Sequence, residues 1–252
     1  MFMFESINAL RRRTVRIGAV GALFLSVYAP LSQASLTLSS SRVVFDGDKR
    51  SVSLVIANPS DKVYAVQTWV NTEADDTTTA VPFMASPPLF RVNPGKEQQV
   101  QINGLPHTLP TDRESLFYFN AQEIPQVDNR QSNVLNIAIR TRIKFFYRPS
   151  QLKDKPQARL KDLQWSIQRR DGKTHLVLNN PTPFHYTFKQ LQLMVDGQPR
   201  RIERPVMAAP LERTVYALDN LPPGPGLQVV FTTINDYGGT TAQMTVPVQS
   251  AP

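Results

Sequence analysis

The sequence predicts an all-β protein built from two immunoglobulin-like β-sandwich domains. Short apolar alternations with a period of two recur along the chain, turn-forming residues separate them, and no long amphipathic helix interrupts them. The length of 252 residues fits two domains of about 100 to 120 residues each. The 21 prolines and 11 glycines are typical of a globular chain with many turns.

The first 34 residues are typical of a secretory signal peptide. Four arginines, at positions 11, 12, 13 and 16, precede an apolar run from Ile17 to Pro30, and Ser32-Gln33-Ala34 provides small residues at the first and third places of a cleavage site. The run is too short for a confident membrane span, which needs ~18 apolar residues or more. We therefore expect cleavage after Ala34 and an exported protein without stable membrane insertion.

Charge and cysteine content exclude several classes of function. Removing residues 1–34 takes away four Arg and one Glu, which lowers the formal net charge from +8 to +5. So mild an excess of positive charge, in an exported chain, argues against a nucleic-acid partner. The absence of cysteine excludes disulfides, thiolate metal sites and a cysteine nucleophile. An exported chain without disulfides fits a bacterial envelope compartment.

The strands of the first sandwich are expected within residues 35–152. Clusters of Asn, Asp, Gly and Pro at residues 46–48, 58–60, 93–95 and 103–104 predict the turns between them. The result is about seven strands, the number expected for an immunoglobulin-like sandwich. The alternating segments are Leu36–Phe45, Ser51–Ala57, Val63–Val70, Gln98–Ile102, Ser115–Asn120 and Asn133–Pro149.

The last of these segments, Asn133–Pro149, is the most informative in the chain. Period-two alternation without internal Pro or Gly predicts one long strand with an apolar row on one face and cations on the other. Such a strand can bind the backbone of another chain. The apolar row contains Leu135, Ile137, Ile139, Ile143 and Phe145, with Thr141 between them, and the cations are Arg140, Arg142 and Lys144.

A second sandwich is expected in residues 153–252. The segment from Arg148 to Lys161 contains two prolines and several cations without alternation, so we interpret it as a connection and place the boundary near Leu152. Turns are expected at 171–172, 196–197 and 236–239. Alternation resumes at Leu163/Trp165/Ile167, Leu176/Leu178, Leu191/Leu193/Val195, Val229/Phe231 and Met244/Val246/Val248.

No motif in the chain indicates catalysis, a metal or a cofactor. The three histidines, His107, His175 and His185, have no ligand spacing, so we interpret them as surface or strand residues. The chain contains no GxSxG motif, P-loop or dinucleotide-binding glycine motif. Asp75 and Asp76 lie in a Thr-rich segment that we expect to be a solvated loop. The expectation is a protein that is not an enzyme and has no cofactor.

Six short motifs occur in order over nearly all of the chain after residue 34. Each is weak alone, but the set is specific, and with it the chain resembles the periplasmic chaperones of the chaperone–usher pilus pathway. The motifs are Ser41–Phe45, Ser86–Val92 with Pro94-Gly95, Arg113–Asn120 with Ile124-Pro125, Ile143–Pro149, Asn180–Pro183 and Ile234–Gly239.

The resemblance implies a fold, a mechanism and partners. The family has two immunoglobulin-like domains arranged at an angle with a cleft between them. Its members lend the last strand of the first domain to a pilus subunit that lacks its own final strand, and deliver the subunit to an outer-membrane usher. The expected location is therefore the periplasm. A long apolar strand edge also favours self-association of the free protein.

The resemblance assigns roles to particular residues. The donor row is Leu135, Ile137 and Ile139, with Thr141 as a weaker continuation, although such aliphatic residues are otherwise usually core. Arg42 and Lys144 match two cations that bind the C-terminal carboxylate of the subunit. Strict alternation places Lys144 and Ile139 on opposite faces, so the anchor role is expected to need a twist or a bulge.

Other residues match features that support the fold of the family. Glu114, Arg148 and Asp236 match a set of ion pairs across the two domains. The bond between Ser86 and Pro87 is cis in relatives, and the sequence leaves both isomers open here. The short segment Gln126–Ser132 favours the short-loop branch of the family, which builds rod-like pili. The extra cations Arg140 and Arg142 leave the subunit preference open.

Two other functions compete with this interpretation. One is an exported adhesin or structural fibre component with two sandwiches, which would need a ligand pocket and usually its own complementing extension. The other is an exported hydrolase, which would need carboxylates or a nucleophile that converge in a pocket. An exposed donor row beside the Arg42/Lys144 pair distinguishes the chaperone from both.

Overall fold

The computed structural model describes residues 36–76, 78–125, 137–170, 172–218 and 226–250. Within these ranges the chain forms strands and turns, and the only helix is a short 3-10 helix at Pro156–Asp162 (η2). The all-β prediction is therefore confirmed. The predicted signal peptide, Leu135 and the segment Gln126–Ser132 lie outside the described residues.

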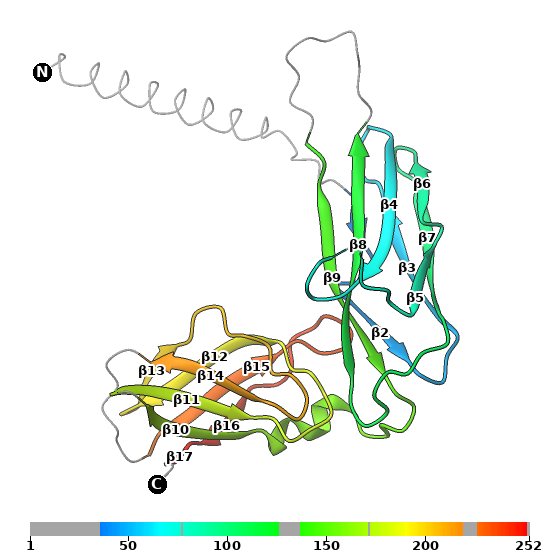
Figure 1. Ribbon diagram of the computed structural model, residues 1–252. Coiled ribbons are helices and arrows are strands. Elements are labelled where there is room, and N and C mark those ends of the chain that lie inside the picture. Colours follow the sequence, from blue (N-terminus) through cyan, green and yellow to red (C-terminus); the bar gives the residue numbers. More distant parts are fainter. Residues whose placement is uncertain (1–35, 77, 126–136, 171, 219–225, 251–252) are drawn as a thin grey trace, which may run out of the picture. The chain divides into compact units, whose positions relative to one another are not determined.

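The strands before η2 form two sheets (Figure 1). One has the order β1-β3-β7-β5 and the other the order β2-β9-β8-β4-β6. The strands are β1 (Thr37–Leu38), β2 (Arg42–Asp46), β3 (Ser51–Ala57), β4 (Tyr64–Asn71), β5 (Phe83–Ser86), β6 (Leu89–Val92), β7 (Glu97–Gly104), β8 (Ser115–Pro125) and β9 (Arg140–Arg148).

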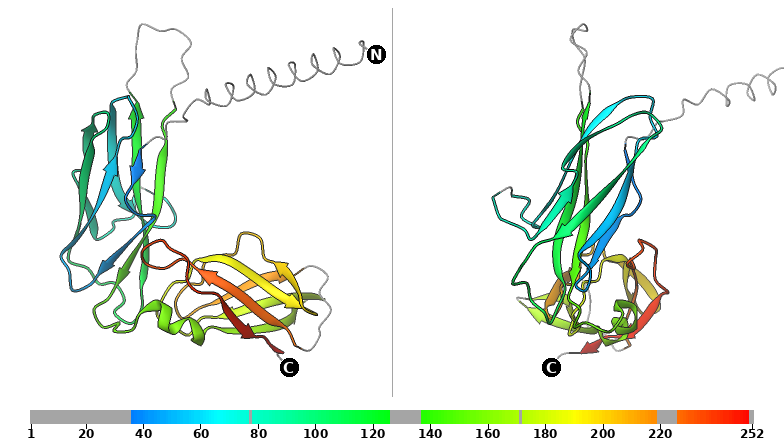
Figure 2. Two further views of the ribbon diagram at one scale, coloured as in Figure 1. Left: turned by 180° about the vertical axis from the view of Figure 1, so that it is seen from behind. Right: turned by 90° about the vertical axis from the view of Figure 1, so that its right-hand side faces the viewer.

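These two sheets enclose one hydrophobic core, and the layers are visible in the side view of Figure 2. Alternate residues of each strand point inward, as in Phe117 and Phe119 on β8 or Phe145 and Tyr147 on β9. The rings of Phe45, Phe83, Phe117, Phe145 and Tyr147 pack at centroid distances of 4.7–6.3 Å.

The segment Leu36–Phe45, predicted as one strand, is divided between the two sheets. Thr37–Leu38 pairs with β3, whereas Arg42–Asp46 runs parallel to β9. The break falls at three consecutive serines, whose hydroxyls offer hydrogen bonds that compete with a regular ladder. Ser39 Oγ accepts from Val55 N at 3.0 Å, and Ser40 Oγ accepts from Arg42 N at 3.4 Å. The change of sheet brings Arg42 beside β9.

The two short strands β5 and β6 were not predicted as strands. They flank the Ser86–Pro87 peptide bond, which is cis. Each has four residues, too few for an alternation to be recognised. Within the described residues strand β9 begins at Arg140, so residues 137–139 are not part of it as predicted, and residues 133–136 lie outside the described ranges. A hydrogen bond of 2.8 Å from Glu123 N to Ile139 O extends the pairing of β8 by one residue.

The strands after η2 form two further sheets around a second core that contains Trp165, Phe188, Phe231 and Tyr216. The order is β14-β11-β10-β17 in one sheet and β13-β12-β15-β16 in the other. The strands are β10 (Gln164–Arg170), β11 (Lys173–Asn179), β12 (Phe188–Val195), β13 (Gln198–Arg201), β14 (Arg213–Leu218), β15 (Gln228–Thr233), β16 (Met244–Pro247) and β17 (Gln249–Ser250).

The predicted turn at Asp196-Gly197 joins β12 and β13. Both residues have positive φ, 49° and 75°, which is typical of a two-residue hairpin turn. Strand β13 was not predicted, because all four of its residues are exposed and show no apolar alternation. No described strand pairs across the two groups of sheets, and the boundary predicted near Leu152 lies between β9 and η2.

Candidate functional site

Strand β9 has an open edge in the part of the chain that the structure describes. On one side it pairs with β8 over Arg140–Tyr147. On its other side it pairs with β2 only from Lys144 onward. The backbone from Arg140 to Ile143 therefore has a described partner on one side only. Unpaired N–H and C=O groups at such an edge can accept another strand.

An apolar row runs out of the core along this open part of β9. Ile143 packs against the first core, and the preceding residues of the same face are Thr141 and Ile139. Ile139 is 45% exposed and Ile137 is 63% exposed. These two side chains are therefore not core residues. The alternative that the apolar row belongs to a core does not hold for Ile137 and Ile139.

Arg42 and Lys144 lie where the open edge ends. They are directly opposite each other in the parallel pairing of β2 and β9, so their side chains lie on the same face. Arg42 Nη1 donates to Ile234 O at 3.0 Å, and Lys144 Nζ donates to Thr187 Oγ1 at 2.9 Å. Neither cation has an ion pair with a described carboxylate. Arg42 is only 8% exposed, and its buried Nε has no hydrogen-bond partner in the structure.

Burial and mutual repulsion destabilise the charges of this pair. Burial, followed by the charge of Arg42, lowers the pKa of Lys144 to about 8. Burial also lowers the pKa of Arg42, although the charges of Asp236 and Glu114 act in the opposite direction. Two partly desolvated cations without a described ion-pair partner are chemically suited to an anion, because a carboxylate between them would restore the charge balance and accept from the free N–H.

The side chains of β9 alternate regularly between its two faces, without a bulge. The register between β8 and β9 is continuous from Ser115↔Tyr147 to Gln122↔Arg140, so the expected distortion near Lys144 is absent from this strand. Odd-numbered residues continue the core face, and even-numbered residues lie on the outer face. Lys144 can therefore contact Thr187 in the second group of sheets while Ile139 remains on the opposite face. Of the two alternatives expected from the sequence, a twist or a bulge, the bulge is absent, and the two roles do not need one face.

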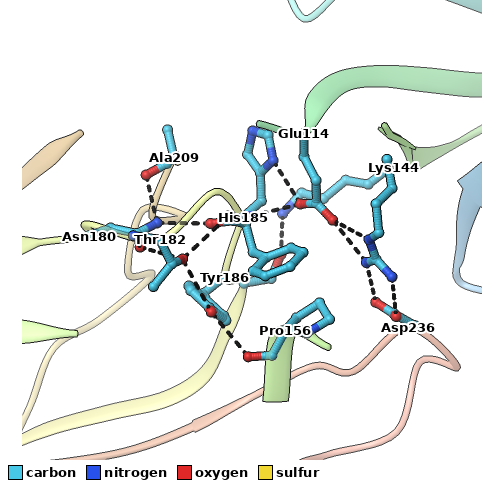
Figure 3. A network of polar contacts seen from close by, with 12 residues as sticks. Glu114, Lys144, Pro156, Asn180, Thr182, His185, Tyr186, Ala209 and Asp236 are labelled. Carbon is cyan, nitrogen blue, oxygen red and sulfur yellow. Dashed lines mark hydrogen bonds and ion pairs between the residues drawn. The ribbon is translucent and has the colours of Figure 1, made fainter. Parts of the chain in front are cut away.

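A network of ion pairs includes Glu114 and Asp236, with Lys144 nearby (Figure 3). Arg148 Nη2 is 2.8 Å from Glu114 Oε1, and Arg148 Nη1 is 2.8 Å from Asp236 Oδ2. The Glu114 side chain is 2% exposed. Burial alone would lower the pKa of Arg148, but hydrogen bonds and charges from Asp236 and Glu114 outweigh it and raise that pKa. The structure thus brings the three predicted residues together and links β9 to the loop after β15.

His185 belongs to this network, which the sequence did not indicate. Its backbone N donates to Glu114 Oε2 at 2.8 Å, and its Nδ1 lies 3.2 Å from the same oxygen. The His185 side chain is 6% exposed, so the expectation of a surface or strand residue was wrong. No motif surrounds a lone histidine. Only its position directly after the Asn180–Phe184 segment could have signalled its role.

The Asn180–Pro183 motif explains why His185 faces Glu114. Asn180 is fully buried, and its Nδ2 donates to Phe184 O at 2.8 Å and to Ala209 O at 2.7 Å. Its Oδ1 accepts from Thr182 N at 3.1 Å, which makes a local turn. Pro183 O accepts from Glu114 N at 2.9 Å. The turn therefore fixes the backbone at the point where the two groups of sheets meet.

A groove with a volume of about 780 Å³ adjoins Lys144. Tyr118, Glu73 and Lys144 contribute to it from the first group of sheets, and Val206 and Val215 from the second. The latter two are exposed.

Among the described residues, no cluster of His, Cys, Asp or Glu could hold a metal, and no helix is long and apolar enough to span a membrane.

The Asp75-Asp76 segment lies in a solvated loop, as the sequence predicted, but its two carboxylates have specific partners. Asp75 forms an ion pair with Arg140 of β9, and Asp76 accepts hydrogen bonds from three threonines, Thr72, Thr78 and Thr79. The sequence could not indicate these contacts, because the partners on β9 lie about 65 residues away and are joined only by the pairing of sheets.

Comparisons with known proteins give one consistent result. A family model described as pili and flagellar-assembly chaperone, PapD N-terminal domain, matches residues 35–153, and one described as pili assembly chaperone PapD, C-terminal domain, matches residues 158–245. The chaperone protein FimB/FhaD of Bordetella pertussis is 34% identical over 240 residues, which cover 91% of this chain and 95% of the relative. The chaperone protein PapD of Escherichia coli is 35% identical over 216 residues, or 82% of this chain and 84% of PapD.

A solved structure agrees with these sequence matches. The crystal structure of the YadV chaperone superposes with a TM-score of 0.73 at 32% identity, and the match covers 85% of this chain and all of the YadV chain. The matched family models lie on the two groups of sheets described above. The chain therefore belongs to the PapD family of pilus-assembly chaperones, proteins of the bacterial periplasm that act on pilus subunits.

Proposed function

We propose that this chaperone holds an incomplete pilus subunit by lending it the open part of β9 together with the residues directly before it, and by binding the C-terminal carboxylate of the subunit between Arg42 and Lys144. The donated side chains are Leu135, Ile137 and Ile139, with Thr141 at the end of the row. The subunit is then passed to an outer-membrane usher. The chaperone itself performs no catalysis, and its signal peptide is removed after Ala34.

The observation that supports the proposal best is the position of the cation pair at the end of the open edge. A strand that pairs with residues 137–143 on the side of β2 must stop where β2 begins, at Arg42. If it runs parallel to β9, as β2 does, its C-terminal end meets Arg42 and Lys144. An antiparallel strand would bring its N-terminal ammonium to two cations. Charge therefore selects the parallel direction with a free carboxylate at the end.

The energies are sufficient for capture. Full burial of an aliphatic side chain contributes about 1.5–3 kcal/mol relative to exposure, and Ile137 and Ile139 are exposed in the free chain. Charge-assisted hydrogen bonds to a carboxylate contribute about 1.5–3 kcal/mol each. Backbone hydrogen bonds along the open edge add to both. The apolar row supplies most of the affinity, and the carboxylate fixes the register.

The ion pairs of Arg148 with Glu114 and Asp236 have a supporting role in this proposal. They link β9, which carries Lys144, to the loop that carries Ile234, whose carbonyl accepts from Arg42. They therefore keep the two cations in place relative to the second group of sheets. Tight geometry is needed, because a carboxylate must reach both cations at once.

Co-expression with a fimbrial subunit from the same genome tests the proposal. We expect a stable one-to-one complex with the wild-type chain and its loss in Arg42→Ala and in Lys144→Ala. Lys49→Ala is the matched control, because Lys49 is an exposed cation whose only described ion pair is with Asp46. Unchanged binding in both anchor variants, with circular dichroism like that of the wild type, would disprove the carboxylate anchor.

A substitution in the apolar row tests strand donation separately from the carboxylate anchor. Ile137→Asp places a charge on a side chain that is 63% exposed in the free protein, so folding is expected to be retained while the complex is lost. If the variant instead unfolds the free protein, the row is part of a core and strand donation by Ile137 is wrong. Thermal unfolding of the purified variant distinguishes the two results.

A further inference from the structure

Two arginines on the outer face of β9, Arg140 and Arg142, are held by side-chain contacts. Arg140 donates from Nε to Asn120 Oδ1 at 2.9 Å and from Nη2 to the same oxygen at 2.7 Å, and it also pairs closely with Asp75. Its guanidinium lies 5.0 Å from the ring of Trp69. These contacts account for most of its hydrogen-bonding groups.

Arg142 is held by contacts with the same part of the chain as Arg140. Its Nη2 donates to Thr72 O at 2.7 Å and to Glu73 O at 3.2 Å, and its guanidinium lies 3.7 Å from the ring of Tyr118. Its Nε is 3.8 Å from Asp75 Oδ1. The two arginines therefore share one carboxylate, and each also lies against an aromatic ring of the same sheet, Trp69 on β4 or Tyr118 on β8, where a cation is stabilised.

Asp75, which accepts from the arginines, is itself held by hydrogen bonds. Asp75 has a φ of 61° and accepts from Asn71 Nδ2 at 2.6 Å. Hydrogen bonds from Arg140 and Asn71 lower the pKa of Asp75 below its usual value. The neighbouring Asp76 closes the turn by accepting from Thr79 N at 2.6 Å. The two carboxylates beside the arginines thus have hydrogen bonds of their own within this exposed part of the chain.

The backbone groups of the same two arginines face the open edge. Glu123 N donates to Ile139 O, and pairs that exchange hydrogen bonds alternate along an antiparallel ladder. Odd-numbered residues of β9 therefore direct their N–H and C=O groups to β8. Arg140 and Arg142 direct theirs to the opposite side, where β2 has not yet begun. A subunit strand would bond to these backbone groups.

We propose that Arg140, Arg142 and Asp75 are positioning residues that hold the open part of β9 extended before a subunit arrives. This inference rests on the proposed strand donation. The side chains fix the outer face, so the backbone groups of Arg140 and Arg142 point to the open edge and the apolar row points to the other face. The arginines act on the subunit through the strand and do not bind it.

The physical advantage is a smaller loss of conformational freedom during capture. A single edge strand that is bonded on one side frays, and each residue that must be ordered on binding opposes association. Contacts that already order residues 139–143 remove this loss from the binding step. Asp75 also offsets one of the two positive charges, which weakens the repulsion between this strand and a basic subunit.

Hydrogen exchange of the free protein tests the inference without any subunit. In the double variant Asp75→Asn/Arg140→Gln, and separately in Arg142→Gln, we expect the amides of Thr141 and Ile143 to exchange about tenfold faster, the ratio that one lost charge-assisted contact produces. The matched control is Arg201→Gln/Glu203→Gln, which removes an exposed pair at 3.6 Å far from β9. Exchange at Val100, in the core of the other sheet, is expected to stay unchanged.

Capture kinetics provide the second readout. A fimbrial subunit from the same genome, diluted from denaturant into each variant, is expected to associate about tenfold more slowly with the positioning variants, whereas the Arg201/Glu203 control matches the wild type. Unchanged exchange at Thr141 and Ile143, or an equal increase at Val100, would overturn the positioning role. Failure of the wild type itself to capture the subunit would instead refute strand donation and leave the exchange result valid.

Discussion

Lys144 is a cation in an unfavourable place. It is partly buried, it lies beside Arg42, and the only described hydrogen bond of its ammonium is to the neutral hydroxyl of Thr187. Such a group destabilises the free protein, and a bound anion would remove this cost. Binding sites commonly carry residues of this kind, because the stability that is lost in the free state becomes affinity in the complex.

The lowered pKa of Lys144 predicts how subunit capture depends on pH. Because burial and Arg42 lower its pKa from 10.5 to about 8, the free site loses charge as the pH rises through about 8. The unfolded chain keeps that proton up to its higher pKa, so the free protein becomes more stable over the same interval. Subunit affinity is therefore expected to fall above pH 8 while the unfolding free energy rises.

Titration of affinity across that interval, with Lys144→Arg as control, checks this prediction. Arginine keeps its charge throughout, so the variant is expected to bind without the loss above pH 8. Denaturant unfolding of the wild type at the same pH values gives the stability. A wild-type affinity that stays constant from pH 7 to about pH 9.5 contradicts the assignment, since a carboxylate anchor on Lys144 needs the ammonium form.

At the level of elements, β9 is divided along its length. From Lys144 to Tyr147 it is a central strand between β2 and β8, and from Arg140 to Ile143 it has a described partner on the β8 side only. The change occurs because the serines at 39–41 move the chain from one sheet to the other, so β2 covers only the later half of β9. The loop after β15 meets the same serines, since Gly238 lies against Ser41.

Gly238→Ala is predicted to destabilise this junction. Gly238 has a φ of +83°, and an added Cβ would overlap Ser41 Oγ. Gly197→Ala is the matched control, because its φ of +75° is similar and nothing lies within 4 Å of its Cβ position. Both variants lose about 1 kcal/mol to the left-handed backbone conformation.

The Gly238 variant is expected to lose more stability than the control and also to bind a subunit more weakly, because the loop carries Ile234, the acceptor for Arg42. Denaturant midpoints give the stability difference, and the complex with a fimbrial subunit gives the binding difference. Equal losses in the two variants would show that Ser41 simply moves aside, and that the contact does not position Arg42.

At the level of the whole molecule, two separate cores support one shared site. The first core holds β9 and β2, the second holds the turn with His185 and the loop with Asp236, and the ion pairs of Arg148 join them. An open strand edge with an exposed apolar row is otherwise an aggregation hazard. Charged side chains on the outer face of the strand are one common protection against it.

Weak self-association of the free chaperone is predicted from the same edge. Two copies can cover Ile137 and Ile139, which are exposed, although the area is small and the dimer should be weak. Sedimentation velocity is expected to show a concentration-dependent dimer that disappears in Ile139→Lys and remains in Val215→Lys, an exposed position on β14. A dimer that persists in Ile139→Lys places the interface elsewhere.

Local patterns determined much of the fold. Strand Ser51–Ala57 has the predicted bounds, and the turn at Asp196-Gly197 has the predicted place, because period-two alternation and left-handed turn residues are local signals. The Leu36–Phe45 segment was wrongly predicted as one strand, since a change of sheet leaves the alternation almost intact. Short strands such as β5 and β13 carry too few residues for a pattern.

The sequence by itself determined the all-β class, the apolar row of Asn133–Pro149 and, through its motifs, the family. Only the tertiary structure decided that β2 ends the open edge at Arg42, that His185 joins Glu114, and that Asp75 holds Arg140. The physical reason is that alternation reports which face a side chain occupies, whereas partners depend on sheet order and on register. Those are set by contacts between residues far apart in the chain.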